Sequence, residues 1–277
     1  MQFDYIRPQD WAEAVRLLAQ PDTVGKMGGC DLLARHRRGK LKAKLVVGLD
    51  RIPEGDIVSL AGDRLRIGHA VTLAQLARNA EFRKHFTLVA NQIGQIASPA
   101  VRSMASVVGN IAQGWSVGDV VPLLMIYDAE LVIRGTSGER KMLVADYAAR
   151  SGNQALQPGE LIVRLEIPML GANLRVAYER FCFRRTFDLP LVSVAAGFAA
   201  GGQNARIACV GGAGMPARCP AAEAAIEGNR LDDAAVQAAL AAIIAWAKPV
   251  SDHLASADYR RHVLGVTASR ALAQLVS

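Results

Sequence analysis

Three glycines within five residues, Gly25, Gly28 and Gly29, constrain the fold of this chain more than any other feature. They stand in the stretch 24–33, which reads VGKMGGCDLL and follows the first amphipathic segment. Glycine lacks a side chain and adopts positive φ readily, so its backbone can approach a ligand closely and successive N–H groups can converge on a phosphate. The stretch therefore indicates a pyrophosphate-binding turn. An ordinary turn between a helix and a strand is the alternative.

A second stretch of small residues lies at 98–112 and reads SPAVRSMASVVGNIA, with Gly118, Asp119 and Pro122 shortly after it. It offers a hydroxyl, a glycine, an amide side chain and a carboxylate within a short distance along the chain. Such groups can bind a ribityl chain and a pyrophosphate by hydrogen bonds, without cationic side chains. The alternative is a buried loop in which the same polar residues cap helices or stabilise turns.

Length and composition indicate a folded protein of about two domains. The chain has 277 residues, of which 51% are apolar and 21% charged, so it can bury a full core. No apolar run approaches the roughly 18–20 residues of a membrane helix, and the start MQFDYIRPQD lacks the plan of a signal peptide. We therefore expect a cytoplasmic protein without membrane insertion.

The cysteines and histidines form no metal-binding pattern. The cysteines are widely separated and include no CxxC pair, and no histidine falls in a pattern such as HExxH. We therefore expect no metal site and no iron–sulfur cluster within this chain. The residues concerned are Cys30, Cys182, Cys209, Cys219, His36, His69, His85, His253 and His262.

The net charge of +7 includes one dense basic run at 35–44. Its cations are Arg35, Arg37, Arg38, Lys40, Lys42 and Lys44. No aromatic residue is interleaved with them, although bases of a single-stranded nucleic acid would need aromatic faces for stacking. The run therefore predicts a solvated or partner-facing loop, and no nucleic-acid partner.

Periodicity predicts alternating helices and strands up to about residue 170. An amphipathic helix is expected at 11–19 with Asp10 as its N-cap, and another through residue 80 with Thr72 as its cap. A helical pattern at 86–96 ends before the Ser98-Pro99 step. Strands are expected at 45–47, 64–67, 128–134 and 161–167.

The composition shifts after Gly171-Ala172-Asn173, and the pattern that follows predicts a separate α+β domain. Strand-like runs come first, then helical ones. They cover 177–184, 192–199 and 205–210, and then 221–227, 232–248 and 259–276. We expect the boundary near residue 171.

Together, the two stretches resemble a known family, the FAD-binding medium subunits of carbon monoxide dehydrogenase and xanthine dehydrogenase-type molybdenum hydroxylases. Its first motif reads approximately A-G-G-T-D-L-L, and its second Q-[IV]-R-N-x-[AG]-[ST]-[IV]-G-G-N-[IL]-A. This chain has MGGCDLL at 27–33 and AVRSMASVVGNIA at 100–112. The resemblance continues through PLLMIYDAEL at 122–131, ELI at 160–162, EIP at 166–168, YERF at 178–181, RRTFD at 184–188, and Gly211, Gly212, Pro216 and Arg218. It covers essentially the whole chain.

The resemblance implies an α+β architecture with two domains. Residues 1–170 would form a two-subdomain FAD-binding fold of the vanillyl-alcohol-oxidase/PCMH type, divided at about residue 55, and 171–277 a small domain with a three-stranded sheet and helices. The chain would carry FAD and no catalytic residue of its own. Molybdopterin and [2Fe-2S] clusters would lie in a large and a small partner subunit, in a dimer of heterotrimers. FAD would pass electrons from the clusters to a final acceptor.

By position in the family motifs, the resemblance also implies a set of cofactor-binding residues. The first motif would line the pyrophosphate and ribityl part of FAD, the second the opposite wall, and Arg180 would stand in place of a family lysine near the flavin. The set is Gly25, Lys26, Met27, Gly28, Gly29, Cys30, Asp31, Leu32, Ile96, Ala97, Ala105, Ser106, Gly109, Asn110, Asp119, Leu161, Ile162 and Arg180. For Arg180, a plain surface salt bridge is the alternative.

Two residues depart from the family pattern. Met27 replaces an alanine, and Val108 replaces the first glycine of the second motif. Valine is poorly suited to positive φ, so either the backbone at 108 is ordinary or flavin binding is weakened. Two other functions stay open on these grounds: a flavin-free scaffold subunit, and a self-contained flavin oxidoreductase of the same superfold.

Overall fold

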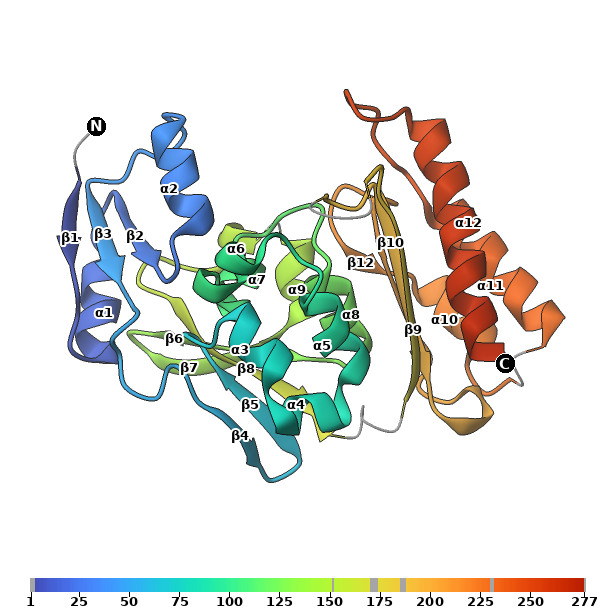
Figure 1. The fold of residues 1–277 in the computed structure, drawn as a ribbon, viewed down its shortest axis with the longest axis horizontal. Helices are drawn as coiled ribbons and strands as arrows, with labels where there is room; N and C mark the ends of the chain where they lie inside the picture. The colour runs from blue at the N-terminus through green and yellow to red at the C-terminus, as the bar shows by residue number, and fades with distance from the viewer. Residues whose placement is uncertain (1–2, 151, 170–173, 185–187, 230–231, 277) are drawn as a thin grey trace.

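Three β-sheets follow one another along the long axis of the molecule, from the N-terminal unit to the C-terminal helices (Figure 1). The computed structural model describes residues 3–150, 152–169, 174–184, 188–229 and 232–276. None of the helices described there is both long and apolar enough to cross a membrane.

The N-terminal unit is a three-stranded parallel sheet in the order β1-β3-β2. Parallel neighbours need crossover connections, which two helices supply. The elements are β1 (Asp4–Ile6), α1 (Trp11–Leu18), β2 (Thr23–Lys26), α2 (Cys30–Arg37) and β3 (Leu45–Gly48). Asp10 caps α1 as predicted, because its carboxylate accepts a hydrogen bond of 2.8 Å from the Glu13 N–H. The glycine stretch, predicted only as a turn, connects β2 to α2.

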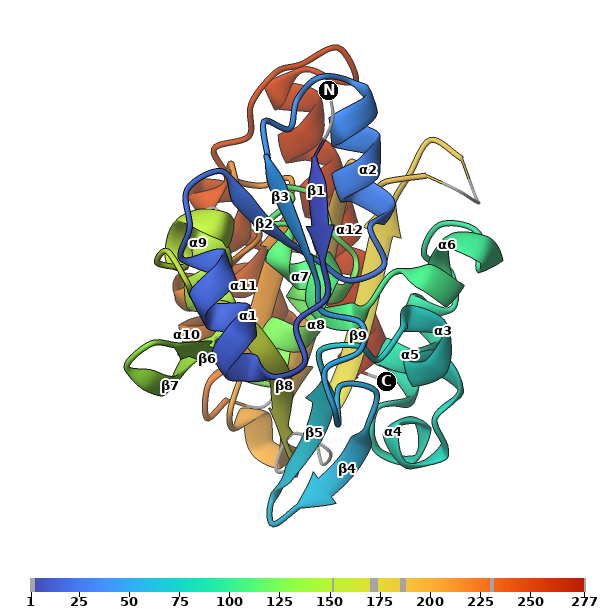
Figure 2. The same cartoon turned by 90° about the vertical axis from the view of Figure 1, so that its left-hand side faces the viewer.

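The central unit is a five-stranded antiparallel sheet in the order β4-β5-β8-β6-β7, with helices packed over one face (Figures 1 and 2). The strands are β4 (Val58–Ala61), β5 (Arg64–Gly68), β6 (Glu130–Gly135), β7 (Gly138–Leu143) and β8 (Leu161–Pro168). The helices are α3 (Leu73–Arg78), α4 (Ala80–His85), α5 (Thr87–Ile93), α6 (Pro99–Met104), α7 (Val107–Ala112), α8 (Val120–Ile126) and α9 (Val144–Ala149). The sheet and these helices enclose the main hydrophobic core.

Two helices of the central unit are shorter than the sequence predicts, and new helices begin soon after they end. The helix capped by Thr72 ends at Arg78 rather than at residue 80, because Asn79 is extended and its side chain accepts from the Phe82 N–H as the cap of α4. The helix predicted at 86–96 spans only Thr87–Ile93. The sequence predicts that Pro99 ends this helix, but the helix ends at Ile93, and Pro99 instead starts α6, where its missing N–H would have no partner within the helix anyway.

The C-terminal unit is an antiparallel sheet in the order β12-β11-β10-β9, with three helices on its outer side (Figure 1). Its elements are β9 (Arg175–Phe181), β10 (Val192–Phe198), β11 (Arg206–Val210), β12 (Ala217–Arg218), α10 (Pro220–Ile226), α11 (Asp233–Trp246) and α12 (Ala257–Val276). The three predicted strands and three helices are present, and the two-residue strand β12 adds a fourth. The predicted boundary near residue 171 lies outside the described residues.

A cluster of ion pairs joins the central and C-terminal units. Asp128, in a left-handed conformation before β6, accepts hydrogen bonds of 2.9 Å from both Arg206 and Arg218. Arg218 in turn forms a two-pronged pair of 2.7 Å with Glu223 of α10. Helix α8 also packs against β10 and β11. The two units therefore share an extensive contact.

A second charge cluster covers the face of the central sheet away from its helices, and it makes stability depend on pH. The buried carboxylate of Glu166 accepts bonds of 2.7 Å from Lys141 and 2.8 Å from Arg164. Burial raises the pKa of Glu166, but the two cations outweigh burial and hold that pKa below its ordinary value. The pKa values of Glu139 and Glu160 are lowered in the same way by their arginine partners.

We expect these depressed pKa values to produce acid destabilisation. The stabilisation is fully present above the unfolded-state pKa of about 4.3 and is lost as pH falls through the lower folded-state values. Urea unfolding at a series of pH values measures this loss. Glu166→Gln should lower stability at neutral pH by about 1–3 kcal/mol and make the acid slope shallower. An unchanged slope in this variant would contradict the assignment.

Candidate functional site

The turn between β2 and α2 packs against the turn between α6 and α7, so the two small-residue stretches meet. The closest approach is at Gly28, where an added Cβ would lie 1.9 Å from the Met104 carbonyl oxygen and 3.1 Å from the Ala105 nitrogen. No side chain fits there, which explains the glycine. Gly29 adopts φ of 71°, the left-handed region that glycine favours, and it starts α2.

The N-terminal end of α2 presents uncapped backbone N–H groups at this junction. Gly29 is the N-cap and has no side chain to accept from the first turn, which is formed by Cys30, Asp31 and Leu32. First-turn N–H groups have no partner inside a helix, and the helix dipole adds partial positive charge at this end. Burial raises the pKa of the Cys30 thiol, so this side chain stays neutral and does not repel an anion. These features suit a phosphate.

Helix α7 forms the opposite wall. Ser106 is its N-cap and accepts a 3.0 Å hydrogen bond from the Gly109 N–H, so the capping role considered for this residue is present. An added Cβ on Gly109 would lie 2.8 Å from that hydroxyl oxygen. The partly exposed Asn110 amide forms no side-chain hydrogen bond with any residue that the structure describes. It is therefore available to a ligand.

The segment before α6 is held by Arg102, which the sequence analysis did not include in the site. Its guanidinium donates to the carbonyls of Ile96 at 2.7 Å and Ala97 at 2.8 Å. Ala97 has φ of 47°, which is uncommon for a residue with a side chain, so this clamp fixes a strained turn. The Ile96 and Ala97 backbones are thus tied to α6, which also contacts Gly28.

Asp119 and Arg180 bind each other across the contact between the central and C-terminal units. The Nη1 group of Arg180 lies 3.1 Å from both carboxylate oxygens, and the buried Tyr178 hydroxyl donates to the same carboxylate at 2.8 Å. The salt bridge considered for Arg180 is therefore present, but it is largely buried, with 13% of the arginine side chain exposed. Asp119 stands at the start of α8, beyond the loop 113–118 that follows α7.

Two of the nitrogen atoms of the Arg180 guanidinium remain available as hydrogen-bond donors. Burial lowers its pKa, but Asp119 more than compensates, so the pKa stays above the ordinary value and the guanidinium stays charged. Burial and the neighbouring Asp119 raise the pKa of Tyr178 well above its ordinary value, so it remains a donor. The Nε and Nη2 groups of Arg180 bind no other described residue. Local sequence gave no sign that Tyr178 belongs here, because its partner is 59 positions away.

Several other residues of the predicted set contribute no free side chain. Leu161 and Ile162 of β8 are each 5% exposed and lie in hydrophobic clusters, although α7 packs against this strand. Gly25 packs against Leu49, and Lys26 donates to the Met27 carbonyl at 2.9 Å. These positions shape the junction rather than offer groups to it.

Val108 and Met27, the two residues that depart from the family pattern, both pack into hydrophobic clusters. Val108 is the second residue of α7, is 4% exposed and belongs to the main core. Its backbone is helical, so the ordinary conformation considered for it is the one present. Met27 packs against the cluster that α1 forms with β3 and β8. Neither side chain obstructs the junction.

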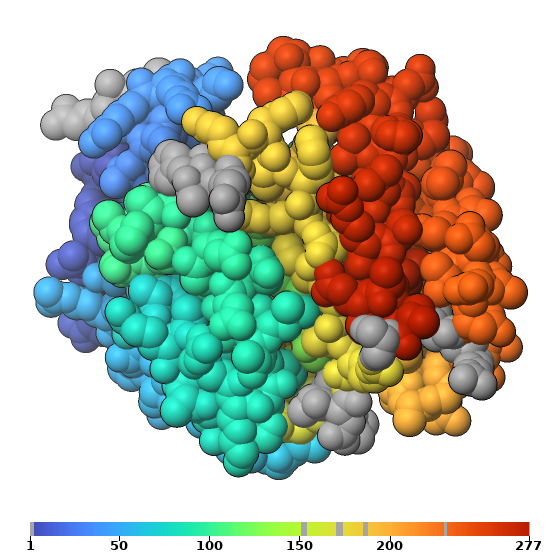
Figure 3. Space-filling model, turned by 45° about the vertical axis from the view of Figure 1, so that its right-hand side comes forward, coloured from blue at the N-terminus to red at the C-terminus, as the bar shows by residue number. Residues whose placement is uncertain are grey.

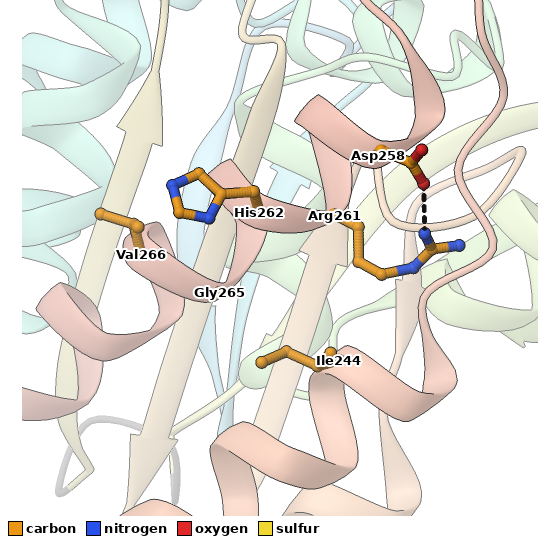
Figure 4. Close-up of a pocket in the computed structure, with 6 residues that line it drawn as sticks. All are labelled: Ile244, Asp258, Arg261, His262, Gly265 and Val266. Atoms are coloured by element: carbon orange, nitrogen blue, oxygen red, sulfur yellow. Dashed lines mark hydrogen bonds and ion pairs between the residues drawn. The ribbon is translucent and has the colours of Figure 1, made fainter.

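A shallow hollow between α11 and α12 lies on the outer face of the C-terminal unit, away from this junction (Figure 4). It is lined by Ile244, Asp258, Arg261, His262, Gly265 and Val266. Arg261 pairs with Asp258 at 3.0 Å, which leaves few polar groups for a ligand. In the described part of the chain, no three His, Cys, Asp or Glu residues are placed to hold a metal ion.

The donor set at the junction fits FAD. Uncapped N–H groups of α2 suit a pyrophosphate, and the Asn110 amide suits hydroxyl oxygens. The Arg180 guanidinium, which lies on β9 against Asp119, suits carbonyl oxygens. The close contact at Gly28 brings the two walls together without a side chain between them. Most of these donors are backbone or neutral groups.

Comparison with known proteins gives two family matches that together cover most of the chain. Residues 1–170 match the family described as FAD binding domain in molybdopterin dehydrogenase, and 177–275 match the CO dehydrogenase flavoprotein C-terminal domain. The xanthine dehydrogenase FAD-binding subunit of Escherichia coli O157:H7 is 26% identical, with 99% of this chain and 96% of that protein covered. The carbon monoxide dehydrogenase medium chain of Hydrogenophaga pseudoflava is 27% identical, with 98% and 96% covered.

Solved structures of carbon monoxide dehydrogenases contain chains with the same fold. A structure of carbon monoxide dehydrogenase from Hydrogenophaga pseudoflava, lacking the Mo-pyranopterin moiety of its cofactor, contains a chain that matches with a TM-score of 0.93 and 29% identity. The match covers 99% of this chain and 97% of that one. Reconstituted CO dehydrogenase from Oligotropha carboxidovorans gives a TM-score of 0.92 at 27% identity, with 99% and 97% covered.

Proposed function

Because this chain belongs to the family of FAD-binding medium subunits of molybdenum hydroxylases, we propose that it holds FAD at the junction of the β2–α2 turn and α7 and relays electrons there. The single observation that carries the location is the approach of Gly28 to the Met104 carbonyl, which joins the two motifs. The bound flavin would accept electrons from iron–sulfur clusters and pass them to a final acceptor.

We propose distinct roles for the residues of the site. The first-turn N–H groups of α2 would bind the pyrophosphate, and Asn110 would bind ribityl or phosphate oxygens. Arg180, held by Asp119, would offer its free Nε and Nη2 groups to carbonyl oxygens of the flavin, while Tyr178 holds the same Asp119 carboxylate. Because Arg180 lies on β9, the C-terminal domain would take part in cofactor binding. We place the boundary between the two domains at about residues 170 and 171.

The relatives are medium subunits or chains of multi-subunit dehydrogenases, and this supports an assembly with other subunits. We propose a large molybdenum subunit and a small iron–sulfur subunit as partners, in a cytoplasmic dimer of heterotrimers. The partners would supply the substrate site, since this chain offers no metal-ligand cluster in its described residues. Its own residues bind, orient and shield the flavin.

The test begins with the isolated chain. We expect it to take up about one FAD, with visible bands that bleach on chemical reduction and a higher melting temperature than the flavin-free chain, since a ligand stabilises the state it binds. The complex from the natural source should contain molybdenum and iron in addition to FAD. A chain that never binds FAD would support the alternative of a flavin-free scaffold subunit. A chain that oxidises a reductant and reduces an acceptor unaided would support a self-contained oxidoreductase.

A further inference from the structure

The cations at the end of α2 form an exposed basic face, which we define as Arg37, Arg38, Lys40 and Lys42. All four side chains are exposed, and none forms an ion pair with a described residue. The two flanking cations differ, because Arg35 lies 3.9 Å from Asp31 and Lys44 lies 3.0 Å from Asp22. Among the described residues, no carboxylate therefore neutralises these four like charges within six residues.

Arginines elsewhere in the structure contrast with this face. Many of those on the central sheet and in the C-terminal unit bind carboxylates at short distances, several of them in clusters. Examples are Arg64, Arg66, Arg134, Arg140, Arg164, Arg206, Arg218 and Arg260. The basic face is thus not a general property of a chain with net charge +7, but a local concentration of unpaired cations.

The helix that carries this face is incompletely packed. None of the residues of α2 is buried, and its apolar residues Leu32 and Leu33 remain partly exposed, as does Leu41 after it. In Figure 1, α2 stands at the top of the N-terminal unit, on the side of its sheet that faces the rest of the molecule, and in Figure 3 the blue spheres at the upper left form a shoulder of the molecule. Arginine beside partly exposed leucine is typical of a protein interface, whose rim is polar and whose centre is apolar.

A nucleic acid and the FAD pyrophosphate are two other ligands that the basic face could bind, but both agree less well with these observations. No aromatic side chain is interleaved between the four cations, so stacking of nucleic-acid bases has no platform. The proposed FAD pyrophosphate would lie at the N-terminal end of α2, whereas the basic face is at the C-terminal end and in the loop beyond. An eight-residue helix spans roughly 12 Å, about one Debye length at moderate salt, so the face adds little to cofactor binding.

We propose that the basic face docks an acidic protein surface on a partner subunit of the complex. This inference rests on the proposed function, which supplies the partners but not the face that meets them. Opposite charges across an interface steer association and fix the orientation of the partners, and the attraction weakens as salt screens it. The partly exposed leucines of α2 would lie at the apolar centre of the contact, with the lysines at its rim.

The test uses the whole complex, purified from the natural source through a tag on this chain. Molybdenum, iron and FAD are measured per chain across a series of salt concentrations. The variant Arg37→Gln, Arg38→Gln, Lys40→Gln, Lys42→Gln removes four charges from the face. The matched control Arg51→Gln, Arg78→Gln, Lys84→Gln, Lys248→Gln removes four other exposed cations that form no ion pair with described residues.

At about 0.15 M salt we expect the face variant to lose roughly fivefold or more of its molybdenum and iron per chain, while its FAD content and melting temperature stay unchanged. The control should keep both metals to within about twofold, since scattered surface charges contribute little. Metal retention by the wild type should fall as salt rises.

Several results would overturn the proposal. A face variant that retains both metals as the wild type does would show that the face is solvated. Equal losses in the control would show an effect of net charge alone. Loss of FAD would assign the face to the cofactor, and loss of bound nucleic acid with metals retained would assign it to nucleic acid. A wild-type chain that carries no molybdenum or iron would refute the proposed assembly itself, and this proposal with it.

Discussion

Replacing Gly28 by alanine should abolish FAD binding. The added Cβ would lie 1.9 Å from the Met104 carbonyl oxygen and 2.6 Å from its carbonyl carbon. Both atoms belong to backbone, so no side-chain rotation relieves the overlap. The β2–α2 turn or the α6–α7 turn must move by about 1 Å or more, and a displacement of that size separates the two walls of the site. We expect FAD affinity to fall by roughly 100-fold or more.

Titration of the flavin-free chain with FAD, followed by flavin fluorescence, measures this effect. Gly118→Ala is the matched control, because Gly118 lies beside Asp119 and its added Cβ would meet only a Val121 methyl carbon at 3.9 Å. The control should bind FAD as the wild type does. Circular dichroism should show that both variants are folded, although overpacking at Gly28 should cost about 1–3 kcal/mol. Full FAD binding by folded Gly28→Ala would mean that the junction of the two turns is not the cofactor site.

The elements that sequence predicted well are those whose determinants are local. The cap at Asp10 follows from its side chain, the strand over Leu161–Pro168 from alternation, and the helices of the C-terminal unit from helical patterns. Helix α2 lacked such signals, because its cap is a glycine without a side-chain hydrogen bond and it buries no residue. Strand β12 is two residues long, too short to form a pattern.

In the candidate site, too, local features were predictable from the sequence and contacts between distant residues were not. Positive φ and close approach favour glycine, and the structure shows positive φ at Gly29 and a close approach at Gly28. The approach at Gly28 is to the Met104 carbonyl rather than to a ligand, and binding of the cofactor by this stretch stays a prediction. The contact of Asp119 with Tyr178 and Arg180 was not predictable from spacing, since residues about 60 positions apart meet only through the packing of two units. The family motifs included Tyr178 and Arg180, and Asp119 lies between two of them, but they gave no indication of which side chains bind one another.

Val108 shows where a family pattern and local physics separate. A glycine at this position in the family motif suggests positive φ or close contact with the cofactor, and on that ground Val108→Gly would leave FAD binding unchanged or tighten it. In this chain Val108 lies in the first turn of α7, with helical backbone and its side chain in the main core. The reason for expecting tighter binding is therefore absent.

We accordingly expect Val108→Gly to destabilise the chain without improving FAD affinity. Removing three buried carbons leaves a small cavity, which costs about 1–3 kcal/mol, and glycine in a helix costs about 1 kcal/mol more than alanine. Because valine is itself a poorer helix former than alanine, only part of that helix cost is added, and urea unfolding should show a loss of about 1–3.5 kcal/mol for Val108→Gly. Val108→Ala removes only two of the three carbons and introduces the better helix former, so it should lose less stability; the difference between the variants reports the remaining carbon together with the cost of glycine in a helix. FAD titration should give affinities for both variants no tighter than that of the wild type. Tighter FAD binding by Val108→Gly at unchanged stability would contradict this expectation, because it would mean that the Val108 side chain limits access of the flavin to α7 instead of packing in the core.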